Sequence, residues 1–242
     1  MRVVTVLGAG VMGSAMTLPF ADRGFAVRLV GTHLDEAIVD SVRATGFHPK
    51  LNVTLPSAVR GFSHGEFGAA LADDTDLILL GVSSAGVGWA IDRFCETLKR
   101  PAPILMITKG MHPEPDSLAA LPDVVASSLK QKLGFDVPVA AIGGPCIAGE
   151  LAARRHTGTV IVSHDPQLAE SLCAALETGY YHPRPSTDML GVETCAAFKN
   201  FFAIAVGWAH GALERMEPAE NRALNNNAAA VIFDQAVHEL MV

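Results

Sequence analysis

The sequence predicts an α/β fold: a mostly parallel sheet followed by a segment that is helical throughout. Two observations lead to this. Short β-branched runs alternate with helical patterns up to about residue 184, which is typical of right-handed βαβ units. Beyond that point only helical patterns remain. We therefore expect two domains, residues 1–184 and 185–242, joined by the proline-containing stretch "HPRPSTD" (182–188) as a linker.

The individual elements follow from length and periodicity. Buried parallel strands are short continuous apolar runs, whereas helices are longer and end near glycine or proline. The predicted strands are 3–7, 25–30, 76–82, 103–108, 137–142 and 157–163. The predicted helices are 11–22, 86–99, 166–177, 189–213 and about 219–241. No pattern assigns an element to residues 51–68.

Composition restricts the class of protein. Half of the 242 residues are hydrophobic and 18% are charged, which provides a sizeable core and argues against disorder. The net charge of −7 argues against nucleic acid as a partner. The four cysteines form no C-x-x-C pair and the nine histidines show no metal-ligand spacing, so we expect no metal site and a reducing, cytoplasmic setting.

The stretch "ETCAAFKNFFAIAVGWAHGA" (193–212) is apolar on nearly every side yet contains Lys199. It is about long enough to span a bilayer, but Lys199, Asn200 and His210 would be costly in lipid and basic flanks are absent. We therefore predict a buried central helix and no membrane span. The last helical pattern runs to Val242 without a cap, which favours a longer natural chain.

The segment Gly8-Ala9-Gly10-Val11-Met12-Gly13 fits G-x-G-x-x-G and stands between a predicted strand and a predicted helix. In such a turn the first glycine allows the tight bend and the second lets the backbone approach a pyrophosphate. The third lets the helix pack closely on the strand. The positive end of the helix then faces the phosphates. We predict a dinucleotide site that includes Gly8, Gly10, Val11, Met12 and Gly13; an ordinary glycine-rich turn is the alternative.

The end of the second strand bears on the choice between NAD and NADP. NAD sites usually place an acidic residue there for the ribose hydroxyls, but this chain has Thr32 and His33, with Asp35 and Glu36 slightly later. Thr32 and His33 could tolerate a 2′-phosphate or could be plain loop residues. Exclusive NAD preference is therefore unsupported, and the cofactor is NAD or NADP.

Two later strand ends carry candidate substrate groups. Ligands bind beyond the carboxyl ends of parallel strands. Lys109 follows the fourth strand and could meet an anion there, or could be a solvated surface lysine. Gly143 and Gly144 follow the fifth strand, and their amides could line the same crevice. Cys146 has no basic partner evident in sequence, so we do not assign it as a nucleophile.

Five segments carry a family resemblance. "GAGVMGSAM", "DLILLGVSS", "MITKG", "GGPCIAGELA" and "DMLGVETCAAFKNFFAIAVGWAHG" occur in the order found in NAD(P)-dependent glycerol-3-phosphate dehydrogenases. The chain resembles this family along nearly its whole length. The resemblance implies a Rossmann-type domain followed by an all-helical substrate domain, apparently truncated here. It also implies hydride transfer between NAD(P)(H) and dihydroxyacetone phosphate or sn-glycerol 3-phosphate, within glycerophospholipid metabolism.

The same resemblance implies residue roles. Lys199 would be the proton donor and acceptor, Asn200 would contact the substrate, Lys109 would lie where cofactor and substrate meet, and Ala148 would contact the cofactor. We add Gly144 as a substrate-binding residue. The family's Arg-Asn pair for the substrate phosphate would fall past Val242, so the exact substrate is open.

The residues themselves suggest what Lys199 does. Desolvation in an apolar helix lowers the pKa of a lysine, which suits proton exchange with a carbonyl or alcohol near neutral pH. A structural pairing with Glu193 or Glu239 is the alternative. We expect an oxidoreductase with a small, phosphorylated substrate, and we leave a homodimer open. Competing hypotheses are a dehydrogenase of another small polyol phosphate or hydroxy acid, or a non-catalytic nucleotide-binding sensor.

Overall fold

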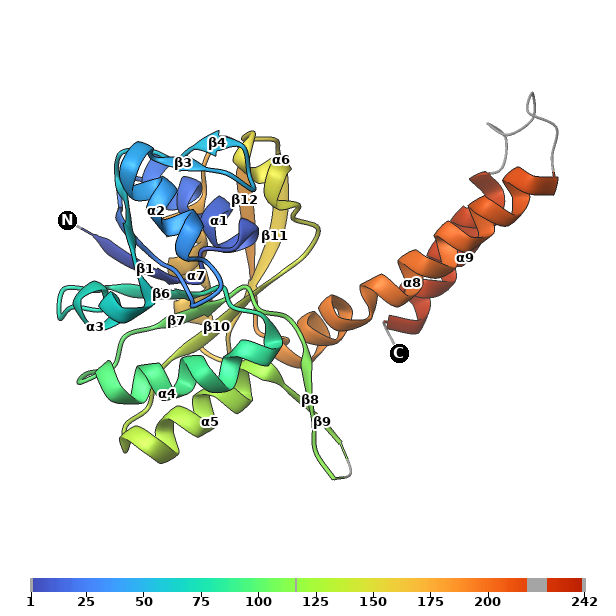
Figure 1. Ribbon diagram of the computed structural model, residues 1–242. Coiled ribbons are helices and arrows are strands. Elements are labelled where there is room, and N and C mark those ends of the chain that lie inside the picture. Colours follow the sequence, from blue (N-terminus) through green and yellow to red (C-terminus); the bar gives the residue numbers. More distant parts are fainter. Residues whose placement is uncertain (1, 116, 217–225, 241–242) are drawn as a thin grey trace.

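A computed structural model describes residues 2–115, 117–216 and 226–240. Its centre is an eight-stranded sheet in the order β12-β11-β10-β7-β6-β1-β2-β5 (Figure 1). The sheet strands are β1 (Val3–Leu7), β2 (Ala26–Val30), β5 (Val59–Phe62), β6 (Leu77–Leu80), β7 (Ile104–Met106), β10 (Val139–Gly143), β11 (Thr157–Val162) and β12 (Tyr181–Ser186). Neighbouring strands are parallel except β10 and β11, which are antiparallel.

Helices cover both faces of this sheet because its inner strands are apolar on both sides. Leu79 of β6 packs into one buried cluster and Leu80 into the other. The first cluster includes side chains of α1 (Val11–Asp22), α2 (Glu36–Thr45), α6 (Ala148–Ala152) and α7 (Pro166–Leu176). The second includes side chains of α3 (Phe67–Ala70), α4 (Val87–Thr97) and α5 (Leu121–Leu133).

Short elements complete the sheet domain. The region 51–68, which had no predicted element, contains part of the hairpin β3 (Phe47–His48) and β4 (Val53–Thr54), then β5 and the 3₁₀ turn η1 (His64–Glu66). A second hairpin, β8 (Met111–Pro113) and β9 (Leu118–Ala120), follows β7. The 3₁₀ turn η2 (Ser84–Gly86) connects β6 to α4.

The predicted linker 182–188 is wrong in its main part. Residues Tyr181–Ser186 form β12, which pairs in parallel with β11 at the edge of the sheet. An edge strand needs hydrogen bonds on one side only, so it tolerates Pro183 and Pro185. The strand therefore crosses the boundary that we placed at residue 184.

Two helices follow the sheet, α8 (Met189–Met216) and α9 (Asn226–Leu240). Figure 1 shows α8 leading away from the sheet domain and α9 lying alongside α8. The predicted helices 189–213 and 219–241 thus have counterparts, although residues 217–225 and 241–242 lie outside the described part.

The expectation that residues 193–212 form a buried helix is wrong for this structure. Phe201, Ile204 and Trp208 are 67%, 72% and 73% exposed. Within the described residues, one stretch, Met189–Ala212, is long and apolar enough to cross a membrane by length and composition, and only 17% of the tested part is buried. The sequence pattern correctly gave a helix, but it could not show whether another element of the chain covers its apolar surface.

Candidate dinucleotide site and lysine cluster

The turn after β1 has the conformation that its glycines allow. Gly8 has φ +113°, and its N–H donates to the Val30 carbonyl at 2.9 Å. A Cβ on Gly8 would lie 2.6 Å from the Gly81 carbonyl oxygen. A Cβ on Gly13 would collide with the carbonyl of Gly8, so Gly13 allows α1 to pack closely on the turn.

Gly10 differs from Gly8 and Gly13 because the space that a side chain on it would occupy is open. It is the N-cap residue of α1, and a Cβ built on it meets no heavy atom of the described residues within 4 Å. The first turn of α1 carries no acidic side chain. The unpaired N–H groups and positive dipole end of α1 are therefore available to an anionic group that approaches Gly10.

Beneath the turn lies His48, a residue that the sequence analysis did not identify. Its side chain is fully buried; Nδ1 accepts from the Leu51 N–H at 3.0 Å, and Nε2 lies 3.2 Å from the Ala9 carbonyl. Since Nδ1 is an acceptor, Nε2 carries the proton and donates to Ala9. Burial lowers the pKa of His48, which agrees with a neutral ring. His48 thus supports the middle of the glycine turn.

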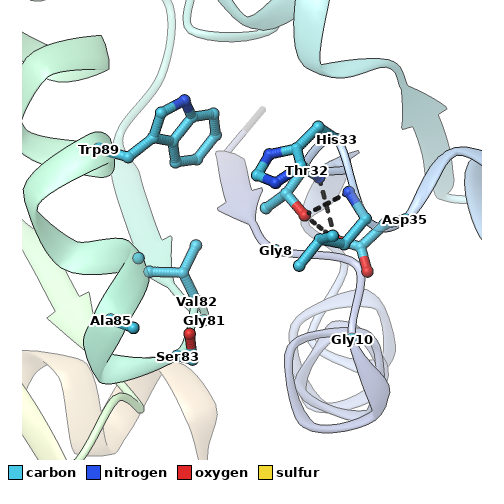
Figure 2. A pocket seen from close by; sticks show the side chains of 12 residues that line it. Gly8, Gly10, Thr32, His33, Asp35, Gly81, Val82, Ser83, Ala85 and Trp89 are labelled. Carbon is cyan, nitrogen blue, oxygen red and sulfur yellow. Dashed lines mark hydrogen bonds between the residues drawn. The ribbon is translucent and has the colours of Figure 1, made fainter.

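A cavity of about 300 Å³ opens beside this turn, at the carboxyl ends of β1, β2 and β6. Figure 2 shows the rings of His33 and Trp89 on opposite sides of it, in an edge-to-face arrangement with centroids 6.5 Å apart. The lining residues are Gly8, Gly10, Thr32, His33, Leu34, Asp35, Gly81, Val82, Ser83, Ala85, Gly86 and Trp89. Four predicted residues, Gly8, Gly10, Thr32 and His33, are among them.

Asp35 is the acidic residue at this cavity, and its carboxylate is already engaged. Its Oδ2 accepts from the Thr32 N–H at 2.9 Å and from the Thr32 hydroxyl at 2.8 Å (Figure 2). The residue is only 8% exposed. The Asp35 carboxylate therefore orders the loop after β2, while Thr32 and His33 line the space.

Other predicted cofactor residues lie around the cavity without lining it. Val11 is 41% exposed at the start of α1, and Met12 packs partly against the core cluster of that face. Gly13 is buried beneath Gly8. Ala148 begins α6, which packs beside α1. Their contact with a cofactor remains a prediction.

A second group of chemically active side chains lies where β7 and β10 end. Lys109 follows β7 and is half-buried. Burial, and next the charge of Lys199 on α8, lowers the pKa of Lys109, whereas the nearby Cys146 and Glu193 act in the opposite direction. Burial raises the pKa of the Cys146 thiol, which makes it a poor nucleophile. Lys109, on the turn after β7, and Lys199, on α8, are thus near enough for the charge of one to act on the other.

Two glycines at the end of β10 allow neighbouring elements to pack closely against it. A Cβ on Gly143 would collide with the side chain of Val192, in the first turn of α8. Gly144 has φ +110°, a conformation that favours glycine. Gly143 thus lets the start of α8 pack closely on the end of β10, whereas a Cβ on Gly144 would come within 3.2 Å of the Thr159 backbone on β11.

The burial that we predicted for Lys199 is not found. Lys199 and Asn200 are both exposed on α8. The Lys199 side chain is therefore not buried among the residues that the structure describes. The alternative pairing is also corrected: among the described residues Glu193 faces Lys109, and Glu239 accepts from Gln235 at 2.7 Å.

The sheet order, the glycine turn and the cavity define a dinucleotide-binding protein of the Rossmann type. Residues 3–169 match the family described as "NAD-dependent glycerol-3-phosphate dehydrogenase N-terminus". The chain belongs to the NAD(P)-dependent glycerol-3-phosphate dehydrogenases, oxidoreductases that act on a CH–OH group with NAD or NADP.

Curated relatives and a solved structure agree with this assignment. The chain is 34% identical over 238 residues to the NADP(+)-dependent glycerol-3-phosphate dehydrogenase of Archaeoglobus fulgidus, covering 98% of this chain and 68% of that protein. The enzyme of Corynebacterium kroppenstedtii is 30% identical, with 99% and 67% covered. The crystal structure of the Coxiella burnetii enzyme is 28% identical, with a TM-score of 0.73 and coverage of 93% of this chain and 65% of that one. The chain thus spans about two thirds of the length of these relatives.

Proposed function

We propose that this protein interconverts dihydroxyacetone phosphate and sn-glycerol 3-phosphate with NAD(P)(H). The observation that carries the proposal is that the cavity beside the glycine turn and the half-buried Lys109 lie at the carboxyl ends of neighbouring strands, with Lys199 near enough for its charge to act on Lys109. The carboxyl ends of the parallel strands thus offer both a dinucleotide cavity and cationic groups for a phosphorylated ketone.

The residues of the cavity fit a dinucleotide. The open space over Gly10 admits a pyrophosphate at the N-terminus of α1, and His33 and Trp89 offer ring surfaces to a flat base. When bound, the reduced nicotinamide supplies the hydride. The task of this chain is then to hold the ketone and to move one proton.

We assign the proton transfer to Lys199. Its ammonium donates to the ketone oxygen during reduction, and its neutral amine accepts the hydroxyl proton in the reverse direction. Lys109, Asn200 and the backbone at Gly144 are assigned to hold the substrate. Lys109 supports this scheme because it is half-buried and close to Lys199, so an anion between the two ammonium groups would relieve their repulsion.

We place the enzyme in the cytoplasm, where its product would serve glycerophospholipid metabolism. The four cysteines, all free, support a reducing compartment. We also propose that the protein has no membrane span, because Lys199, Asn200 and His210 interrupt the apolar surface of α8.

A substrate panel tests the function. NADPH oxidation is followed with dihydroxyacetone phosphate, dihydroxyacetone and small 2-keto acids, using the protein in its natural full length. We expect the phosphorylated ketone to have the highest kcat/KM. Preference for a keto acid would favour a hydroxy-acid dehydrogenase, and cofactor binding without turnover of any ketone would favour a sensor.

A further inference from the structure

Glu193 is a fully buried carboxyl group at the base of α8. The side chains beside it fix this part of the helix: Met189 belongs to the core cluster below the sheet, and Val192 packs against Gly143. A fully buried glutamate is rare unless it is paired. Its position therefore needs an explanation in terms of its neighbours.

The hydrogen bond of Glu193 connects α8 to the turn that carries Lys109. Its Oε2 accepts from the Gly110 N–H at 3.3 Å. Gly110 has φ +146°, so this turn uses a conformation that favours glycine. The other oxygen, Oε1, has no hydrogen-bond partner among the described residues. Glu193 thus holds the turn after β7 and retains accepting capacity.

Charged groups of both signs lie around Glu193. Lys109 is its cationic neighbour, and Asp123 of α5 is the like charge that faces it. Lys109 in turn faces Lys199 and Cys146. Glu193 is therefore a buried carboxyl group whose charge acts on Lys109.

We propose that Glu193 is a positioning residue, which fixes the Lys109 turn against α8 and supplies the negative charge that keeps Lys109 beside Lys199. Two ammonium groups repel each other, and a buried carboxylate offsets this repulsion until an anionic ligand arrives. That the ligand is a phosphorylated ketone rests on the proposed function; the positioning of Lys109 does not.

The charge state of Glu193 changes in the neutral range. Burial raises its pKa to about 7, against the effects of Gly110 and Lys109. Below that pH the carboxyl is protonated and the countercharge of Lys109 is lost; above it, Lys109 faces a carboxylate. The environment of the Lys109 ammonium should therefore change near pH 7, as Glu193 titrates.

Lysine ¹³Cε NMR measures this directly, with the Lys109 signal identified by its absence in Lys109→Arg. We expect the wild-type Lys109 shift to show an inflection near pH 7 and Glu193→Gln to lack it. Glu150→Gln is the matched control, because Glu150 is an exposed glutamate of α6 near Cys146. Equal curves in wild type and Glu193→Gln would overturn the proposal.

Kinetics supply the second readout. Glu193→Ala removes the acceptor of the Gly110 N–H, so KM for the ketone should rise about tenfold, the worth of a hydrogen bond to a charged group. The dissociation constant for NADPH should stay within about twofold, since the cavity is elsewhere. Glu193→Gln keeps an acceptor for the Gly110 N–H but loses the charge, so its KM should lie between those of wild type and Glu193→Ala.

The two readouts separate the possible failures. An unchanged KM in both variants would contradict the positioning role. Absence of turnover in the wild type would reject the proposed reaction and leave the NMR titration to decide the role of Glu193. If Glu193→Ala does not fold, the Glu193→Gln titration remains decisive.

Discussion

The three glycines after β1 meet three different physical requirements. Gly8 needs a positive φ and passes close to Gly81, while Gly13 lets α1 approach the turn. Only Gly10 borders empty space. A side chain at Gly10 should therefore affect a ligand far more than it affects the fold.

Gly10→Val should fold and lose cofactor affinity by at least about tenfold, because its methyl groups would fill the space beside the N-terminus of α1. The measurement is a fluorescence titration with NADPH, with thermal unfolding of the same sample. Gly158→Val is the matched control, since an added Cβ on this exposed β11 residue also meets open space. A folded Gly10→Val with unchanged affinity would show that the phosphates bind elsewhere.

Lys199→Met should reduce turnover by about 10²–10⁴-fold, the usual worth of a general acid–base group. Because Lys199 is exposed on α8 and lies outside the cavity, NADPH binding and folding should persist. Steady-state kinetics with dihydroxyacetone phosphate measure the effect, and the exposed Lys99→Met serves as control. Turnover close to that of wild type would remove Lys199 from the proton transfer.

At the scale of elements, we propose that the loop after β2 meets the adenosine end of the cofactor. The Asp35 carboxylate is bound to Thr32, and the loop presents Thr32 and His33 to the cavity. We expect the protein to bind NADPH. Its dissociation constant for NADPH should exceed that for NADH by less than about a hundredfold, or roughly 3 kcal/mol. Dissociation constants of both cofactors in one buffer test this. A larger preference for NADH would indicate that Asp35 turns toward the ribose.

Helix α4 contributes Trp89 to the cavity wall, so we expect a cofactor bound there to change the fluorescence of Trp89. The chain has two tryptophans, and Trp208 lies on α8 outside the cavity. In the variant Trp208→Phe, which retains Trp89, oxidised cofactor should quench the fluorescence by contact with Trp89. In Trp89→Phe, which retains Trp208, the fluorescence should stay nearly unchanged. The reverse pattern would place the base near α8 instead.

The inner strands could be predicted because both their faces are buried, which produces continuous apolar runs such as Leu77–Leu80. The edge strands could not. β5 is short and partly exposed, and β12 contains two prolines, so neither has an apolar pattern. The antiparallel setting of β11 also has no signal in its own sequence.

At the scale of the whole molecule, a sheet domain carries the cavity and a helical hairpin projects from it (Figure 1). The glycine turn was predictable because its spacing and context are local. The lysine cluster depends on contacts between residues far apart in sequence, such as Gly110 and Glu193. The exposed state of Lys199 was not predictable, since an apolar pattern does not say what covers it.

The most direct test follows both reactants at once. The protein in its natural full length is mixed with NADPH and dihydroxyacetone phosphate, and ³¹P NMR and NADPH absorbance are recorded together. We predict one glycerol 3-phosphate formed for each NADPH consumed. If the quenching of Trp89 shows that cofactor is bound and the dihydroxyacetone phosphate signal nevertheless stays constant, the proposed reaction is contradicted.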